Sequence, residues 1–458
     1  MMNQRQVIPV LLAVYVGFVL YNTFIPFVLD VGWAEALNEL RSLSWEGSTS
    51  GRTDLIANVV LFWPCGGLVY LFLRARGWRH PILGSLIAGA LFSSFIEGSQ
   101  LFISYRRTAI HDVVCNALGS GSGALGVALF RRAIAPVVLT CTANTLRRQP
   151  LVLILVVIAL AQITATLLPF KVPMTLADMK HNVRSVNVAP FDNQSVGKLV
   201  FNRPTSQDDE PFDLIGFMAY LLLWLPVGYI LMLCHGFYWR RRPNGLMWLG
   251  LATCAYFPLT EGLQLFIISR VMDVNDVLSG YLGICGGMAM CRLLRVSPPD
   301  ENPYDPAHLK IPLLLYGVFV VFVLFQPFDW SFAAEARAWN WSWKFLVPFY
   351  WYHDALSLWN VPYLIASLVV FLPFSLYGAY DCRRRGASWL HTGVLTSLLG
   401  LACGIAIEGL QLLSASRVAE ITDVLAYTSS GVTGTLLLAY YEQELRPRAF
   451  PTWVMQRS

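Results

Sequence analysis

The residues of this chain that could do chemistry recur as a spaced set of four polar side chains, found in three places. In each set a Glu is followed by a Gln three residues later, an Arg nine residues later and an Asp fifteen residues later. A carboxyl group removed from water can act as a general acid or base, and an Arg beside it can bind an anionic group. The sets are Glu97, Gln100, Arg106 and Asp112; Glu261, Gln264, Arg270 and Asp276; and Glu408, Gln411, Arg417 and Asp423.

These sets stand in a strongly apolar chain. Of its 458 residues, 56% are hydrophobic and 13% are charged, which is about half the charged share of a typical soluble domain. Windows of about 20 residues without Lys or Arg recur along the chain, and that length of helix crosses the hydrocarbon layer of a membrane. Because lipid leaves exposed backbone unsatisfied, such segments should be helices. We predict an all-α polytopic membrane protein with about 12 transmembrane helices.

The three sets belong to longer internal repeats. A proline within a hydrophobic run precedes each Glu by 33 to 35 residues, at Pro64, Pro226 and Pro373. Each copy has room for four helices, and an even number of helices keeps every copy in the same orientation. We therefore expect three parallel four-helix repeats, at residues 1–146, 147–309 and 310–458.

Small residues recur after each Asp, at the seventh and eleventh positions. Residues spaced by four lie on one face of a helix, and small side chains there let helices approach closely inside a membrane. We interpret them as packing positions. They are Gly119 and Gly123, Gly283 and Gly287, and Ser430 and Gly434.

The positive charges predict the orientation in the membrane. Most of the 33 basic residues fall in loops on the side of Arg5. Because cytoplasmic loops carry an excess of Lys and Arg, this distribution places both termini in the cytoplasm. The short turn that carries the Arg of each set then lies on the outer side of the membrane.

Several function classes lose their sequence support. The chain has no Walker A loop, no H-E-x-x-H and no G-x-S-x-G, so ATP hydrolysis, zinc hydrolysis and ordinary serine-hydrolase chemistry are not indicated. Its nine cysteines form no zinc-type spacing, and we expect no metal and no cofactor. The Arg clusters are short and explained by topology, so nucleic acid is not an expected partner. The oligomeric state stays open.

Together these positions resemble the pattern of the VanZ-like membrane family, and the chain is similar to three VanZ-like units in tandem. The middle copy matches most completely. It has Asn187-Val188-Ala189-Pro190-Phe191 ahead of Glu261, and an extra acid, Asp273, between Arg270 and Asp276.

The first and third copies depart from this pattern at particular positions. The first copy keeps Asn116 four residues after its Asp, but it has no acid at the position of Asp273 and no clear second Pro-Phe. In the third copy Glu420 takes the position of Asp273, and only Pro348-Phe349 resembles the early element. The resemblance implies a bacterial inner membrane, a cell-envelope role and an association with resistance to the glycopeptide antibiotic teicoplanin.

Three interpretations compete for the polar sets. In the first, the Arg bridges Glu and Asp and clips two helices together, with the Asp also capping the returning helix. In the second, the sets line a groove that binds the headgroup of an amphiphile. In the third, a desolvated Glu is a general acid or base. All three copies keep all four residues, which favours the clip.

The third outer loop is rich in aromatic residues. It contains six tryptophans between positions 328 and 359, which indicate either an aromatic belt at the membrane interface or a platform that stacks on a glycan. They are Trp330, Trp339, Trp341, Trp343, Trp351 and Trp359.

We expect a protein that binds an amphiphilic envelope component or a glycopeptide antibiotic, with membrane lipid or a lipid-linked envelope glycan as partner. A non-enzymatic role is favoured. The alternative is a membrane-embedded enzyme that acts on lipid-linked envelope precursors and uses a Glu as acid or base.

Overall fold

The computed structural model is helical throughout the residues that it describes. Apart from three isolated β-bridges, the described residues contain no strand pairing. The described ranges are 4–24, 30–42, 52–104, 108–167, 176–201, 211–240, 244–267, 270–294, 302–332, 346–350 and 360–450.

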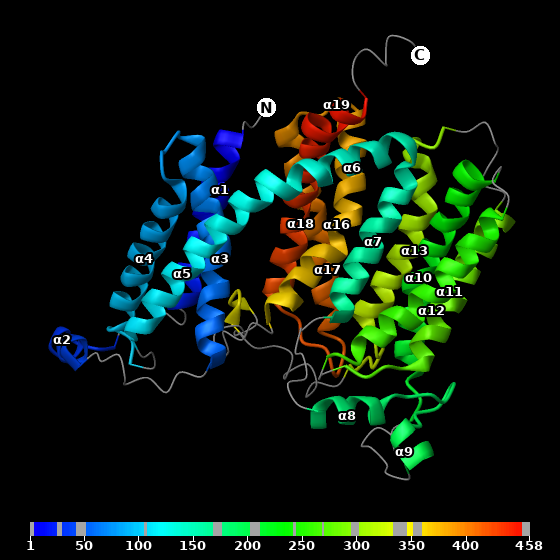
Figure 1. Cartoon of the computed structure of the whole chain (residues 1–458), viewed down its shortest axis with the longest axis horizontal. Helices are drawn as coiled ribbons and strands as arrows, with labels where there is room; N and C mark the ends of the chain where they lie inside the picture. The colour runs from blue at the N-terminus through cyan, green and yellow to red at the C-terminus, as the bar shows by residue number, and fades with distance from the viewer. Residues whose placement is uncertain are drawn as a thin grey trace. The chain divides into compact units, whose positions relative to one another are not determined.

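The chain divides into two compact units, drawn in Figure 1. Unit 1 comprises residues 1–140 together with residues 344–361 of the third outer loop. Its elements are α1 (Gln4–Phe24), α2 (Trp33–Ser42), α3 (Arg52–Ala75), α4 (Pro81–Gln100) and α5 (Ile110–Leu129), which continues through a π-helical turn into α6 (Ala135–Arg148).

Unit 2 comprises residues 141–343 and 362–458. It follows the same order twice, because each of two long helical hairpins is preceded by two further helices. The elements are α7 (Pro150–Leu167), α8 (Leu176–Ser185), α9 (Val196–Phe201), α10 (Leu214–Cys234), α11 (Gly245–Gln264), α12 (Val274–Leu293), α13 (Lys310–Phe325), α16 (Asn360–Arg384), α17 (Trp389–Gln411), α18 (Ile421–Tyr440) and α19 (Arg446–Ala449).

Seven of the described helical segments are long and apolar enough to cross a membrane. They lie in α3, α4, α5 with α6, α10, α13, α16 and α17. Helices α1 and α7 have shorter apolar stretches, and α12 and α18 carry many Gly, Ser and Thr residues, which lower their mean hydropathy. The count of 12 therefore stays a prediction, as does the division into three repeats.

The small residues lie where two helices touch through their backbones. A Cβ added to Gly123 of α5 would overlap the carbonyl oxygen of Trp63 in α3, and one added to Gly287 of α12 would overlap that of Leu225 in α10. At the matching place in the third hairpin, a Cβ added to Gly434 of α18 would lie 2.8 Å from Cβ of Ser375 in α16. The close approach of the paired helices therefore requires small residues at these positions.

Apolar clusters fill the spaces between these pairs. In unit 1, Val19, Phe62 and Ile96 join α1, α3 and α4. In unit 2, Val320, Phe371 and Tyr427 join α13, α16 and α18. This packing holds the ends of α4, α11 and α17, which carry the polar sets.

Candidate polar site at the hairpin tips

Each embedded Glu makes the same hydrogen bond. Its Oε2 accepts from the backbone N–H of the residue twelve positions later: Ala109 for Glu97, Asp273 for Glu261 and Glu420 for Glu408. The N···O distances are 3.1, 3.4 and 2.8 Å. These glutamates are 6%, 2% and 7% exposed, so each carboxyl is buried against the start of the next helix.

The position of that N–H explains why a carboxyl stands there. Ala109, Asp273 and Glu420 are the N-cap residues of α5, α12 and α18. The first N–H groups of a helix have no partner within the helix, and the helix dipole attracts negative charge to this end. The Glu therefore joins the two helices of each hairpin through a hydrogen bond to the backbone. The sequence interpretation had instead assigned this joining to an Arg that bridges Glu and Asp.

The arginines contact a different part of their copy. Arg270 donates to the carbonyl oxygen of Ala165 at 3.4 Å, and Arg417 donates to those of Val323 and Gln326 at 3.0 and 2.8 Å. Ala165 and Val323 both lie two residues before the last residue of their helix, α7 or α13. An Arg at a helix C-terminus satisfies carbonyl groups that the helix leaves open. Arg106 lies outside the described residues.

The glutamines are placed differently in the three copies. Gln411 donates through Nε2 to the carbonyl oxygen of Leu324 at 2.9 Å, so it joins Arg417 at the end of α13. Gln264 is buried, and Gln100 is half-buried at the last position of α4.

The Asp of each set lies inside the first turn of the returning helix, three positions beyond its expected place as an N-cap. In unit 1, Asn58 of α3 donates through Nδ2 to Oδ1 of Asp112 at 2.6 Å. In the third hairpin, Ser367 of α16 donates to Oδ1 of Asp423 at 2.8 Å. Asn58 and Ser367 both stand six residues before the helix proline. Asp112 and Asp423 thus each tie the returning helix to the second helix of their copy. His111 lies 3.3 Å from Asp112.

In the described part of the middle copy, no side chain of α10 donates to Asp276 in the way that Asn58 and Ser367 donate to their Asp. The residue six positions before Pro226 is Tyr220, whose hydroxyl accepts from Gln162 of α7 at 3.4 Å. In the first copy, Asn116 connects α5 to α4, because its Nδ2 donates to Oγ of Ser93 at 2.8 Å.

The middle copy adds a polar network that the other two lack in their described residues. Asn187 donates to Oδ1 of Asp273 at 3.0 Å, and the same oxygen accepts from the backbone N–H of Asn275 at 2.8 Å. The Asn275 side chain in turn accepts from the backbone N–H of Phe191 at 2.7 Å. The Asn-Val-Ala-Pro-Phe segment is therefore folded over the start of α12. Burial raises the pKa of Asp273, and the hydrogen bonds from Asn275 and Asn187 oppose that shift.

The third outer loop supplies a matching segment to unit 1. Phe349 has φ +58°, as Phe191 has φ +59°, a conformation that costs a bulky residue about 1–2 kcal/mol and persists only where its surroundings require it. The Phe349 ring lies 5.2 Å from that of Phe18, and Tyr21 donates to the carbonyl oxygen of Pro348 at 2.9 Å. The first copy, which has no clear second Pro-Phe of its own, is thus packed against the Pro-Phe of a distant segment.

In the third copy a further acid, Glu420, lies at the N-cap of α18. Glu420 stands beside Asp423 and Glu408, and burial together with the charge of Asp423 raises the pKa of Glu420 to about 7. Within the described ranges, no group of three or more His, Cys, Asp or Glu residues is arranged to hold a metal ion.

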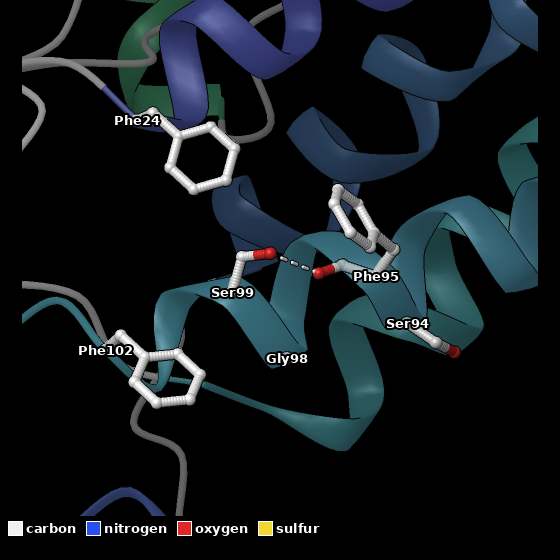
Figure 2. Close-up of a pocket in the computed structure, with 6 residues that line it drawn as sticks. All are labelled: Phe24, Ser94, Phe95, Gly98, Ser99 and Phe102. Atoms are coloured by element: carbon white, nitrogen blue, oxygen red, sulfur yellow. Dashed lines mark hydrogen bonds between the residues drawn. The ribbon is translucent and has the colours of Figure 1, made fainter. Parts of the chain in front are cut away.

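A groove opens at the end of α4. Its volume is about 350 Å³. Figure 2 shows the rings of Phe24, Phe95 and Phe102 around it, with Gly98 and Ser99 between them and Ser94 at its edge beyond Phe95. Six residues line it: Phe24, Ser94, Phe95, Gly98, Ser99 and Phe102. The sequence placed Gly98 and Ser99 within the repeated motif that begins at Glu97, but it assigned none of the six to a site.

Of the six tryptophans in the third loop, Trp330 is described. Its ring lies 5.5 Å from that of Phe325, and its backbone pairs with Ser414 at the hairpin tip. Trp339, Trp341, Trp343, Trp351 and Trp359 lie outside the described residues.

Apolar helices long enough to span a bilayer, joined by buried Glu-to-backbone clips, define a polytopic helical membrane protein. Residues 11–131 and 313–441, together more than half of the chain, match the VanZ/LLP1 family model, and the chain belongs to this family. The two matched segments contain the sets of Glu97 and Glu408, while the set of Glu261 lies between them. No curated protein and no solved structure matches the chain.

Proposed function

We propose that this VanZ/LLP1 protein is a bacterial inner-membrane protein that binds an amphiphilic component of the cell envelope. In this proposal three four-helix units each present a clipped hairpin tip on the outer side of the membrane, and both termini are cytoplasmic. The groove at the end of α4 is the observation that carries the proposal.

The groove suits an apolar chain. Its three aromatic rings provide apolar walls, and its volume of about 350 Å³ falls in the range of small-molecule sites. The hydroxyls of Ser94 and Ser99 donate to the carbonyl oxygens of Ala90 and Phe95, each at 2.8 Å. Because these hydroxyls already have partners, the lining does not require water.

Gly98 keeps one side of the groove free of side-chain atoms. A Cβ added there would have no heavy atom within 4 Å, so helix packing does not require a glycine at this position. The bare backbone leaves room for a ligand to approach α4 closely. The polar tip of the hairpin follows directly, which places a headgroup beside polar atoms while its chain lies against the rings.

The enzymatic alternative has less support. A general acid or base must reach the reacting atom. Glu97 is buried, bonds the N-cap of α5 and is not among the residues lining the groove. The equivalent glutamates of the other copies have the same engagement. A role on lipid-linked precursors would require one clip to open.

The test is to fill the groove. The full-length protein would be purified in mild detergent, and retained lipid, glycan or added teicoplanin would be identified by native mass spectrometry. Gly98→Phe should abolish retention of the bound amphiphile because its ring occupies the groove. Gly409→Phe is the matched control, since Gly409 follows Glu408 as Gly98 follows Glu97 and also faces open space. Equal retention by both variants would exclude the groove as the binding site.

A further inference from the structure

Helix α2 presents an apolar stripe on its exposed surface. Trp33, Leu37 and Leu40 are 75%, 47% and 50% exposed, and their spacing places them on one face of the helix. Glu35 and Asn38 lie on the opposite face. A stripe of large exposed apolar side chains on a helix with a polar opposite face marks a surface that meets another apolar phase.

Helix α2 packs on the turn that follows α4. The backbone N–H groups of Asp30 and Val31 both donate to the carbonyl oxygen of Phe102 at 3.2 Å. The Trp33 ring stands edge-on to the Phe102 ring with 4.8 Å between centroids, and Ala36 is buried. Figure 1 shows α2 at the end of unit 1 where α4 finishes, outside the bundle of α1, α3, α4 and α5.

The stripe continues the apolar surface of a spanning helix. Leu91 and Phe95 are exposed on α4, which is long and apolar enough to cross a membrane. Phe95 and Phe102 both line the groove, and Trp33 packs on Phe102. The rings of Phe95, Phe102 and Trp33 therefore link the apolar outer surface of α4 to α2.

We propose that α2 lies in the plane of the bilayer at the α4 C-terminal end, with Trp33, Leu37 and Leu40 inserted at the boundary between lipid headgroups and acyl chains. Glu35 and Asn38 face the water. Because α2 carries two acids and one arginine, it does not depend on attraction to anionic lipid, and its partner is the acyl region itself. Tryptophan at the start of the stripe suits the headgroup level. This inference needs membrane insertion of α4 and holds whatever occupies the groove.

A photo-cross-linking experiment tests the placement. The benzophenone amino acid p-benzoylphenylalanine would replace Leu37, Leu40, Glu35 or Asn38, one at a time, in the full-length protein. Each variant would be reconstituted in nanodiscs of phosphatidylethanolamine and phosphatidylglycerol, irradiated and analysed by mass spectrometry. We expect phospholipid adducts at positions 37 and 40 with a yield several-fold above that at positions 35 and 38.

Three outcomes would overturn the proposal: equal lipid yield on both faces, no lipid adduct at positions 37 and 40, or covalent dimers from those positions, which would make the stripe an interface between two copies. A second measurement guards against a local folding defect. Leu37→Asp should lower the lipid yield at position 40, whereas Asn38→Asp, a change on the water-facing side, should leave it unaltered. If the unsubstituted protein retains no groove ligand while the lipid adducts at positions 37 and 40 form as expected, the result counts against the proposed function alone.

Discussion

Removal of one Glu clip offers the sharpest test of how the hairpins are held. In Glu408→Leu the side chain keeps a similar volume, but the backbone N–H of Glu420 loses its acceptor at 2.8 Å. A buried donor left without a partner costs about 1–3 kcal/mol, and the upper part of that range applies where the acceptor was ionised. Glu97→Leu and Glu261→Leu should follow the same rule, with the smallest loss at Glu261 because its bond is 3.4 Å long.

The measurement is reversible unfolding of each purified variant in mixed micelles, reported as a free-energy difference from the unsubstituted protein. Glu444→Leu is the control, because Glu444 pairs with Arg448 at 3.3 Å on an exposed surface and such pairs contribute about 0–1 kcal/mol. Unchanged stability in all three clip variants would refute a structural role. A large loss in one copy with none in the other two would refute an equivalent role in each hairpin.

Three further predictions concern charge, packing and the Pro-Phe contact. The raised pKa of Glu420 means that the folded state holds this proton more tightly than the unfolded state, so the free energy of unfolding should fall as pH rises from about 4.5 to about 7. Glu420→Gln should make the free energy of unfolding less dependent on pH over that window, and an unchanged dependence would contradict the assignment. Gly287→Leu should destabilise unit 2 by about 1–3 kcal/mol or prevent folding through overlap with α10, whereas Gly250→Leu, which meets no atom within 4 Å, should not; thermal melts compare them. Tyr21→Phe should cost about 0.5–1.5 kcal/mol by removing the bond to Pro348, and a double-mutant cycle with Phe349→Ala should show coupling; additive losses would argue against the contact.

Much of the architecture could be predicted from residue type and spacing. The runs of apolar residues indicate helices, and the recurrence of Gly at positions such as 123 and 287 indicates close helix pairs. Both follow from local rules of backbone satisfaction and packing. The number of crossings could not be settled in this way, because helices such as α12 face protein on one side and use small residues there in place of apolar ones.

The partners of the polar sets were harder to predict. The spacing of Glu, Arg and Asp brings them near one hairpin tip, but an Arg has several donors and can meet either a carboxylate or a helix end. Arg417 meets the end of α13. The donors to Asp112 and Asp423, Asn58 and Ser367, come from helices about 55 residues earlier in the chain. Both stand six residues before the helix proline, but that spacing does not reveal which side chain each one meets.

The sequence by itself determined the class of protein, the family and the recurrence of one set of four polar residues in three places, because composition, periodicity and fixed spacing are local properties. Only the tertiary structure decided that each Glu bonds a helix N-cap, that Pro348 and Phe349 pack on α1, and that a groove opens beside Gly98. These features depend on which segments, distant in the sequence, pack together. That packing is set by the apolar surface buried across many contacts and not by any single residue.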